Sequence, residues 1–219
     1  MIIAIDGPAG AGKSTIAKLI AKQLAIVYID TGAMYRAIGL KAYRNGVGCF
    51  ETEKISEMLE KTDIRLVNDN GEQRVYLDGE DVSKEIRRPE ISKMASDISA
   101  VPVVRYAMVD MQRKLASKTD TVLDGRDIGT FVLPDADRKF YLTATVKERA
   151  MRRYKELAAR GENVELAEVE QDIAKRDYND SHRTLAPLKK ADDAIEIDTT
   201  GMTISEVCEK IIALCKGIA

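Results

Sequence analysis

The chain has 219 residues, of which 45% are hydrophobic and 32% are charged. This length suits one α/β domain with insertions, and the net charge of −2 excludes a general attraction to nucleic acid. Three scattered cysteines, Cys49, Cys208 and Cys215, exclude a disulfide framework or a zinc site and fit a reducing compartment. Because no apolar run reaches the length of a membrane span, we expect a soluble, cytoplasmic protein.

The first sixty residues have the pattern of a parallel α/β fold. Residues 2–5 are apolar throughout and predict a short buried strand, which a glycine-rich loop follows. Residues 13–24 carry an apolar stripe typical of a helix, and residues 25–29 predict a second buried strand. Residues 33–62 are expected to be helical with a break at 45–48.

The pattern changes at residue 64. Ile64 and Leu66 alternate with polar residues, as do Val75 and Leu77, and Asn70-Gly71 lies between the two runs. This arrangement predicts a β-hairpin, and the hairpin would be an insertion because it interrupts the alternation of strands and helices.

The alternation resumes in the second half of the chain. We expect helices over residues 90–118, 147–160, 166–176 and 204–215, and strands over residues 120–123, 138–142 and 194–197. With the two strands near the start, this predicts five short apolar strands in a parallel sheet with helices around them.

Residues 7–14, GPAGAGKS, match the phosphate-binding pattern G-x-x-x-x-G-K-[ST]. Glycines allow successive backbone N–H groups to point inward, and the positive end of the following helix adds to the attraction for phosphate. Lys13 can reach the β- and γ-phosphates, and the Ser14 hydroxyl can bind Mg²⁺. The position between a predicted buried strand and a helix favours this interpretation over an ordinary turn.

Two further segments follow predicted strands, at the sheet edge where open α/β folds bind ligands. Residues 30–36, DTGAMYR, place a hydroxyl, a glycine and Arg36 together and indicate a second anion site. Residues 124–130, DGRDIGT, carry Arg126, which could bind a phosphate with its guanidinium fork. Asp127 there could accept a hydrogen bond from an exocyclic amine, and Asp124 could hold the hydration shell of Mg²⁺.

Residues 147–161 hold six basic residues and two acidic ones, and their place between core strands suggests a mobile lid that closes over a triphosphate. The basic residues are Lys147, Arg149, Arg152, Arg153, Lys155 and Arg160. Residues 176–183, RDYNDSHR, are rich in partners for ribose and phosphate. For His182, the single histidine, we expect a surface or packing role, because nothing around it suggests activation of a nucleophile.

These four segments, in this order and spacing, resemble the bacterial cytidylate kinases over essentially the whole chain, and the DGRDIGT segment is the most specific of them. The resemblance implies that Arg36, Arg126 and Arg183 bind the phosphate of CMP. Ser96, Arg105 and Asp127 would recognise cytosine, Arg176 and Asp180 would hold the ribose, and Thr31 stands where many members carry serine. The ATP loop would comprise Gly7, Pro8, Ala9, Gly10, Ala11, Gly12, Lys13, Ser14 and Thr15. Lys13, Arg126, Arg183, Arg152 and Arg153 would act in catalysis.

The fold implied is a three-layer P-loop NTPase with a five-stranded parallel sheet, a lid helix segment and a small antiparallel β insertion. The core would comprise residues 1–32, 103–146 and 177–219, the monophosphate-binding region residues 33–102, and the lid about residues 147–176. ATP and Mg²⁺ would be used, with Mg²⁺ on Ser14 and on Asp124 through water. CMP and dCMP would be the acceptors, and we expect a monomer that binds neither nucleic acid nor membranes.

Two other hypotheses stay open from the residues alone. The nearest is another P-loop small-molecule kinase that uses AMP, UMP or a sugar-like alcohol; the number of arginines favours a phosphate acceptor over an alcohol, which would need a positioned base. The other is a regulatory or nucleic-acid-binding P-loop protein, against which the near-neutral charge and the lack of a basic tail argue.

Overall fold

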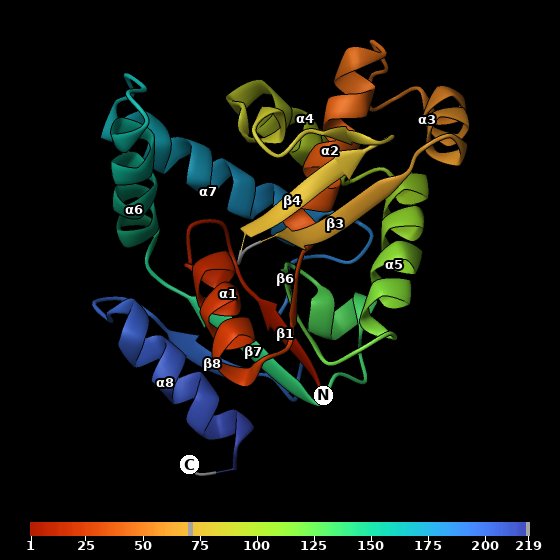
Figure 1. Cartoon of the computed structure of the whole chain (residues 1–219). Helices are drawn as coiled ribbons and strands as arrows, with labels where there is room; N and C mark the ends of the chain where they lie inside the picture. The colour runs from red at the N-terminus through yellow and green to blue at the C-terminus, as the bar shows by residue number, and fades with distance from the viewer. Residues whose placement is uncertain (70–71, 218–219) are drawn as a thin grey trace. The chain divides into compact units, whose positions relative to one another are not determined.

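The computed structural model describes residues 1–69 and 72–217, and the chain divides into two compact units. The first unit comprises residues 1–28 and 116–219, and the second comprises residues 29–115 (Figure 1). The finer boundaries expected for the monophosphate-binding region and the lid stay predictions. In the part of the chain that is described, no helix is both long and apolar enough to cross a membrane.

A five-stranded sheet has the order β2-β6-β1-β7-β8. Its strands are β1 (Ile2–Asp6), β2 (Val27–Asp30), β6 (Thr121–Gly125), β7 (Arg138–Thr143) and β8 (Ile195–Asp198). β1 pairs in parallel with both β6 and β7, and β7 pairs in parallel with β8. The central position of β1 explains its continuous apolar run, because Ile3, Ala4 and Ile5 are fully buried. The predicted α/β class and five-stranded parallel sheet are therefore confirmed.

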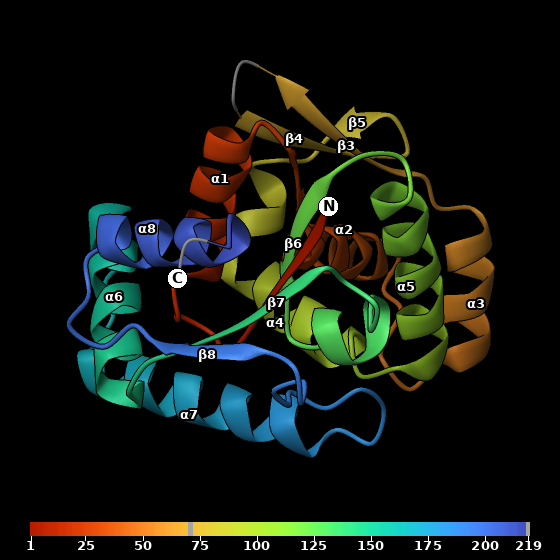
Figure 2. The ribbon, with the colours of Figure 1, turned by 90° about the horizontal axis from the view of Figure 1, so that it is seen from below.

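Helices α1 (Lys13–Leu24) and α8 (Ile204–Cys215) pack together in the first unit, as Figure 2 shows. Ile16 and Ile20 of α1 share a hydrophobic core with Ile211 of α8 and with buried residues of β1, β6 and β7. Both helices have the bounds that their apolar periodicity predicts. Cys208 is buried in the same core, which accounts for that thiol as a packing residue.

Helices α6 (Val146–Ala159) and α7 (Leu166–His182) form a hairpin with a small core of its own, made by Ala150, Leu157, Val169 and Ile173. The prediction that the second helix stops at Arg176 is wrong, because α7 continues to His182. The last turns of α7 carry polar residues with partners outside the helix, among them Asp180, which forms an ion pair with Arg126.

The second unit is built around helix α2 (Thr31–Arg44), which packs against α4 (Pro89–Ile98), η1 (Glu85–Arg87) and strand β4. At Gly39 of α2 a Cβ atom would lie 2.9 Å from the backbone nitrogen of Ala95, so only glycine allows α2 and α4 to approach this closely. Helices α3 (Thr52–Glu60) and α5 (Pro102–Ala116) complete the helical part.

The predicted hairpin is present in the second unit. Strands β3 (Ile64–Asp69) and β4 (Glu72–Leu77) are antiparallel, with Ile64 opposite Leu77 and Leu66 opposite Val75. A two-residue strand that the sequence did not predict, β5 (Glu80–Asp81), pairs with β4 and completes a three-stranded sheet. The proposed turn residues, Asn70 and Gly71, lie outside the described residues.

Two further differences from the predicted helices and strands have a local cause. The single helix expected over residues 90–118 is two helices, α4 and α5, since Pro102 has no N–H to continue a helix and restricts the residue before it. The second strand begins at Val27 rather than at Ala25, because Ala25 adopts the left-handed conformation (φ 54°) that ends α1.

Candidate functional site

The phosphate-binding loop joins β1 to α1 in the first unit. Gly7 (φ 144°) has no room for a side chain, because a Cβ atom there would lie 2.0 Å from the carbonyl oxygen of Leu142. Gly10 and Gly12 also have positive φ angles, of 76° and 86°. The glycines of the motif therefore allow a backbone path that other residues would strain, and α1 begins directly after it at Lys13.

Lys13 lies inside this loop and is 5% exposed. Its Nζ atom donates a hydrogen bond of 2.7 Å to the carbonyl oxygen of Pro8. Burial and the positive charge of Arg126 lower the pKa of Lys13 well below its ordinary value, against the opposing effect of Asp124 and Asp6. A polyanionic phosphate in the loop would compensate this desolvated ammonium.

Ser14 and Asp124 lie together, although they are far apart in the sequence. The Ser14 hydroxyl donates a 2.7 Å hydrogen bond to Asp124, and the Tyr28 hydroxyl donates another of 2.7 Å to the second oxygen of the same carboxylate. A hydroxyl beside a buried carboxylate offers the hard oxygen donors that Mg²⁺ prefers, with the remaining positions left to water and phosphate. The residues present therefore fit Mg²⁺, and the described residues contain no cluster of three or more acidic, histidine or cysteine side chains that would hold it alone.

The end of β6 continues into the motif with Arg126 and Asp127. The Nε atom of Arg126 donates to Asp180 over 2.8 Å. Burial alone would lower the pKa of Arg126, but the negative charges of Asp180 and Asp124 outweigh it and raise that pKa. Asp127 lies in an ion pair of 3.0 Å with Arg183, and both side chains are buried. Four residues with predicted roles are thus joined in two ion pairs.

The C-terminal end of α7 supplies the partners of this motif. Arg176 and Asp180 are four residues apart, so they lie on one face of the helix. Burial raises the pKa of Asp180, but the charges of Arg126 and Arg176 outweigh it, so that the pKa is lowered. Arg183, the residue directly after α7, is fixed further because its Nε atom donates to the carbonyl oxygen of Ala186 over 2.5 Å. His182 is exposed and stacks on Tyr178 with ring centres 3.9 Å apart, so the surface packing role expected for it is confirmed.

The second unit contains the other predicted substrate residues. Thr31 is the first residue of α2, and Asp30 caps this helix by accepting a 2.7 Å hydrogen bond from the backbone N–H of Ala33. Arg36 folds back along the helix toward Asp30, at 3.4 Å. A Cβ atom on Gly32 would lie 3.2 Å from the Arg36 guanidinium, so the glycine makes room for this arginine.

Arg105 of α5 and Ser96 of α4 belong to the same unit. Arg105 is only 1% exposed, and its NH1 atom donates to the carbonyl oxygen of Ser99 over 3.3 Å. Its guanidinium lies 5.6 Å from the ring centre of Tyr35, within the range of a cation–π interaction. Ser96 is connected to the same turn, because its carbonyl oxygen accepts a bond from the Ser99 hydroxyl. The sequence interpretation missed Tyr35, although an aromatic residue directly before Arg36 was a usable signal.

The basic residues of α6 do not behave alike. Arg149 is 4% exposed and donates to the carbonyl oxygens of Ala144 and Ala9 over 2.8 and 2.9 Å. It also forms an ion pair of 2.6 Å with Asp177 of α7. Arg149 therefore fastens the start of α6 to the phosphate-binding loop, and the mobile lid expected for this segment stays a prediction. A sequence run of basic residues cannot reveal which of them points inward.

Arg152 and Arg153, the two lid arginines expected to act in catalysis, are partly exposed. The guanidinium of Arg152 donates hydrogen bonds to the hydroxyl of Thr199 over 3.0 Å and to the carbonyl oxygen of Thr199 over 2.8 Å. Its NH1 atom lies 4.0 Å from the position that a Cβ of Gly12 would take, and so adjoins the phosphate-binding loop. Arg153 pairs with Glu156 at 2.9 Å.

The sheet order and the strand–loop–helix geometry define an α/β fold of the P-loop type. Two solved structures share the fold at low identity: a shikimate kinase from Bacteroides thetaiotaomicron (TM-score 0.50, 12% identity, 99% of this chain and 98% of that one) and a gluconokinase from Sinorhizobium meliloti (TM-score 0.50, 13% identity, 96% and 89%).

The chain belongs to the cytidylate kinase family, because the sequence model of that family matches residues 3–217. A cytidylate kinase of Caldicellulosiruptor bescii is 52% identical over 212 residues, which cover 97% of this chain and 94% of the relative. A cytidylate kinase of Clostridioides difficile is 51% identical over 213 residues, which cover 97% of each chain. The family expected from the four sequence segments is therefore confirmed.

Proposed function

We propose that this protein transfers the γ-phosphate of ATP to CMP, forming CDP and ADP, and that dCMP is accepted as well. The observation that carries this conclusion is family membership over nearly the whole chain. Membership makes the chain a phosphotransferase that acts on CMP and ATP, and the alternatives with UMP or AMP as the main acceptor are not favoured. A monomer in the cytoplasm stays a prediction.

On this proposal the donor is held by the loop from Gly7 to Thr15. The helix end at α1 and the inward backbone N–H groups would bind the phosphates, and Lys13 would neutralise charge on the transferring group. Ser14 would hold Mg²⁺ directly and Asp124 would hold it through water, and the bound ion would supply positive charge that offsets the charge of the phosphates. The 2.7 Å bond from Ser14 to Asp124 supports this pair of ligands.

The residues that would recognise the acceptor are those implied by the resemblance to the family. Arg36, Arg126 and Arg183 would bind its phosphate, and Arg176 and Asp180 its ribose. Asp127, Arg105 and Ser96 would recognise the cytosine edge, since a carboxylate can only accept and the cytosine amino group can only donate. The ion pair between Asp127 and Arg183 supports a role for both in binding the acceptor, because it fixes the proposed base contact beside a proposed phosphate contact.

No general base is needed for this reaction. The attacking oxygen belongs to a phosphate monoester, whose second pKa is about 6, so it is already anionic near neutral pH. Rate enhancement would come from in-line positioning and from neutralising the repulsion between two anionic substrates. Arg152 and Arg153 would complete this neutralisation when the lid closes and excludes water, which otherwise competes as acceptor.

A coupled assay that measures ADP formation tests the proposal. The purified protein is supplied with ATP, Mg²⁺ and one of CMP, dCMP, UMP, AMP or shikimate. We expect the highest kcat/KM with CMP or dCMP. A higher value with UMP, AMP or the alcohol would contradict the acceptor, and ATP hydrolysis without transfer to any of them would contradict the reaction.

A further inference from the structure

Asp6, the last residue of β1, has no role in the mechanism above, yet its carboxylate is buried and fully engaged. It is 5% exposed. Its Oδ1 atom accepts a 2.8 Å hydrogen bond from the backbone N–H of Ile128, and its Oδ2 atom accepts one of 2.7 Å from the N–H of Gly129. Both oxygens of one carboxylate thus hold two successive amides that are 122 and 123 residues away in the sequence.

The two amides belong to a turn that directly follows Asp127. This turn is η2 (Ile128–Val132), a short π-helix that begins after Asp127. The first N–H groups of any helix have no partner within the helix, and here Asp6 supplies that partner. The Asp6 carboxylate at the end of β1 therefore fixes the main chain directly after Asp127.

The packing around the turn leaves little space for a side chain at Gly129. A Cβ atom on Gly129 would lie 3.1 Å from the Cδ atom of Lys139 and 3.4 Å from Oδ2 of Asp6. The glycine in the sequence motif is thus explained by the close approach of Asp6 and Lys139. Asp6 also precedes Gly7, so one residue connects the entrance of the phosphate-binding loop with the turn that carries Asp127.

We propose that Asp6 is a positioning residue for cytosine recognition, which fixes the backbone of Ile128 and Gly129 and thereby the direction of the Asp127 carboxylate. This inference rests on the proposed role of Asp127 as a reader of the base. Because Asp127 is paired with Arg183 at 3.0 Å, a shift of the turn also moves a residue expected to bind the acceptor phosphate. The effect of losing Asp6 should therefore fall on the acceptor more than on ATP.

The test compares Asp6→Asn with Asp127→Asn and with the control Asp193→Asn. Asparagine keeps the size of Asp6 but replaces one acceptor oxygen by an NH₂ group, which faces a backbone donor. Asp193 pairs at 2.7 Å with Lys139, the residue packed on Gly129, but makes no bond to the turn in the part of the chain that is described. For each variant, hydrogen exchange of residues 126–132 and kcat/KM for CMP, UMP and ATP are measured, with the folded fraction followed by circular dichroism.

In Asp6→Asn we expect faster exchange at Ile128 and Gly129, a fall of about tenfold in the ratio of kcat/KM for CMP over UMP, and a KM for ATP near that of the wild type. Asp193→Asn should retain the wild-type ratio. A general loss of folded protein would lower kcat/KM for CMP and for UMP by the same factor and leave their ratio unchanged. An unchanged ratio in folded Asp6→Asn, with Asp127→Asn lowering it, overturns the role of Asp6 alone.

If Asp127→Asn leaves the ratio unchanged, base reading by Asp127 is wrong, and positioning by Asp6 for that purpose is overturned with it. If Asp6→Asn does not fold, Gly129→Ala is the second variant, because its Cβ would press on the contact between Asp6 and the turn while both carboxylates stay intact. A lower ratio of CMP over UMP in folded Gly129→Ala supports the proposal, and an unchanged ratio contradicts it.

Discussion

At the scale of single residues, buried charges dominate the first unit. Lys13, Asp6, Asp124 and Asp127 are each less than one-tenth exposed. Burying a charge is costly unless partners compensate it, so each of these side chains has hydrogen bonds or opposite charges around it. Such groups respond strongly to substitution and to pH, which makes them the best test of the mechanism.

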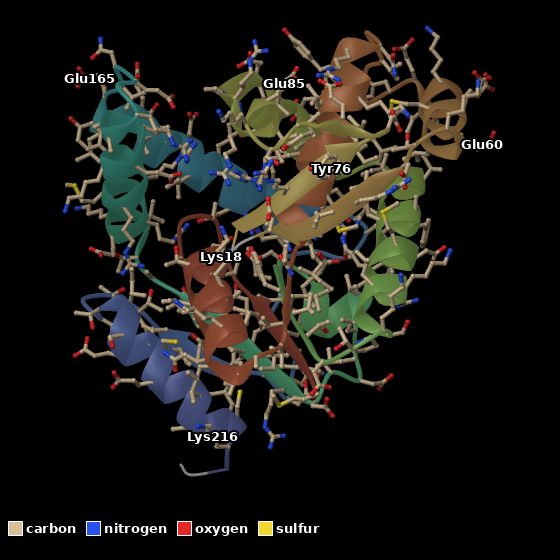
Figure 3. The ribbon with its side chains drawn as sticks, in the orientation of Figure 1. Lys18, Glu60, Tyr76, Glu85, Glu165 and Lys216 are labelled. Carbon is tan, nitrogen blue, oxygen red and sulfur yellow. The ribbon has the colours of Figure 1, made fainter. Side chains whose placement is uncertain are left out.

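Lys13→Ala should lower kcat by at least about 10²–10³-fold, because it removes a donor from the place where negative charge develops in the transition state. The affinity for CMP should stay near the wild-type value, since Lys13 belongs to the donor loop. Turnover and calorimetry with CMP measure the two effects. Lys18→Ala is the matched control: Lys18, labelled in Figure 3, is on the same helix, but its ammonium lies 5.8 Å from the ring of Tyr28. Near-normal turnover of Lys13→Ala would contradict the assignment of the loop.

The stability of the protein should carry a pH-dependent contribution from Asp6. The pKa of Asp6 is raised from 3.8 to about 7 in total: burial raises it most, the N–H groups of Gly129 and Ile128 lower it in part, the charge of Asp127 raises it, and that of Lys13 lowers it. Between these two pKa values the folded chain binds a proton that the unfolded chain releases. The contribution of Asp6 to the free energy of unfolding therefore falls as the pH rises from about 4 to 7, by at most about 1.4 kcal/mol per pH unit.

Urea unfolding of the wild type and of Asp6→Asn across this pH range isolates the contribution, because the other titrating groups are common to both chains. The difference in unfolding free energy, wild type minus variant, should decrease with rising pH. A difference that is constant with pH would show that Asp6 stays ionised in the folded protein throughout.

At the scale of elements, the hairpin of α6 and α7 has a fixed part and a freer part. Arg149 fastens the start of α6 to the carbonyl oxygen of Ala9 and to Asp177. Beyond Arg149, the ion pairs that the described residues show for Arg153 and Arg160 are both with Glu156 of α6. Exposed ion pairs of this kind contribute little to the stability of the fold. The end of α6 is therefore the part of the lid best suited to move.

Hydrogen exchange in residues 151–160 should slow when a bisubstrate analogue binds, since a polyanion would relieve the repulsion among the basic side chains and order the segment. Exchange in residues 146–150 should change less, because Arg149 already holds them. Mass spectrometry of peptides from the two halves of α6 gives the comparison. Equal rates with and without the analogue in 151–160 would falsify a mobile lid.

At the scale of the whole molecule, the fold and its chemistry should respond differently to metal removal. Ser14, Tyr28 and Asp124 satisfy one another by hydrogen bonds, and the described residues hold no cluster that needs a metal for its stability. Chelation with EDTA should therefore abolish phosphate transfer but change the melting temperature of the nucleotide-free protein by no more than about 1 °C, because a site that holds no Mg²⁺ without nucleotide gains no stability from the ion. Added Mg²⁺ should restore activity. A large fall in melting temperature would reveal a structural metal instead.

The sequence by itself determined the features that depend on local order. The phosphate-binding loop, the bounds of α1 and α8, the hairpin and the positions of five strands along the chain follow from spacing, periodicity and turn residues, all of which act over a few positions. The strand-end segments at Asp30 and Asp124 were found for the same reason, because the carboxyl end of a buried strand is visible as the end of an apolar run.

Only the tertiary structure decided which of the polar residues belong together. Ser14 meets Asp124 across 110 residues, Arg126 meets Asp180 across 54, and Arg149 meets Ala9 across 140. Nothing local distinguishes Arg149 from its basic neighbours, or marks Asp6 as the partner of Ile128 and Gly129. Those assignments depend on which strands are neighbours in the sheet and which helix face packs inward. A buried charge is costly without a partner, so each charge that the fold buries is placed beside a partner from a distant part of the sequence.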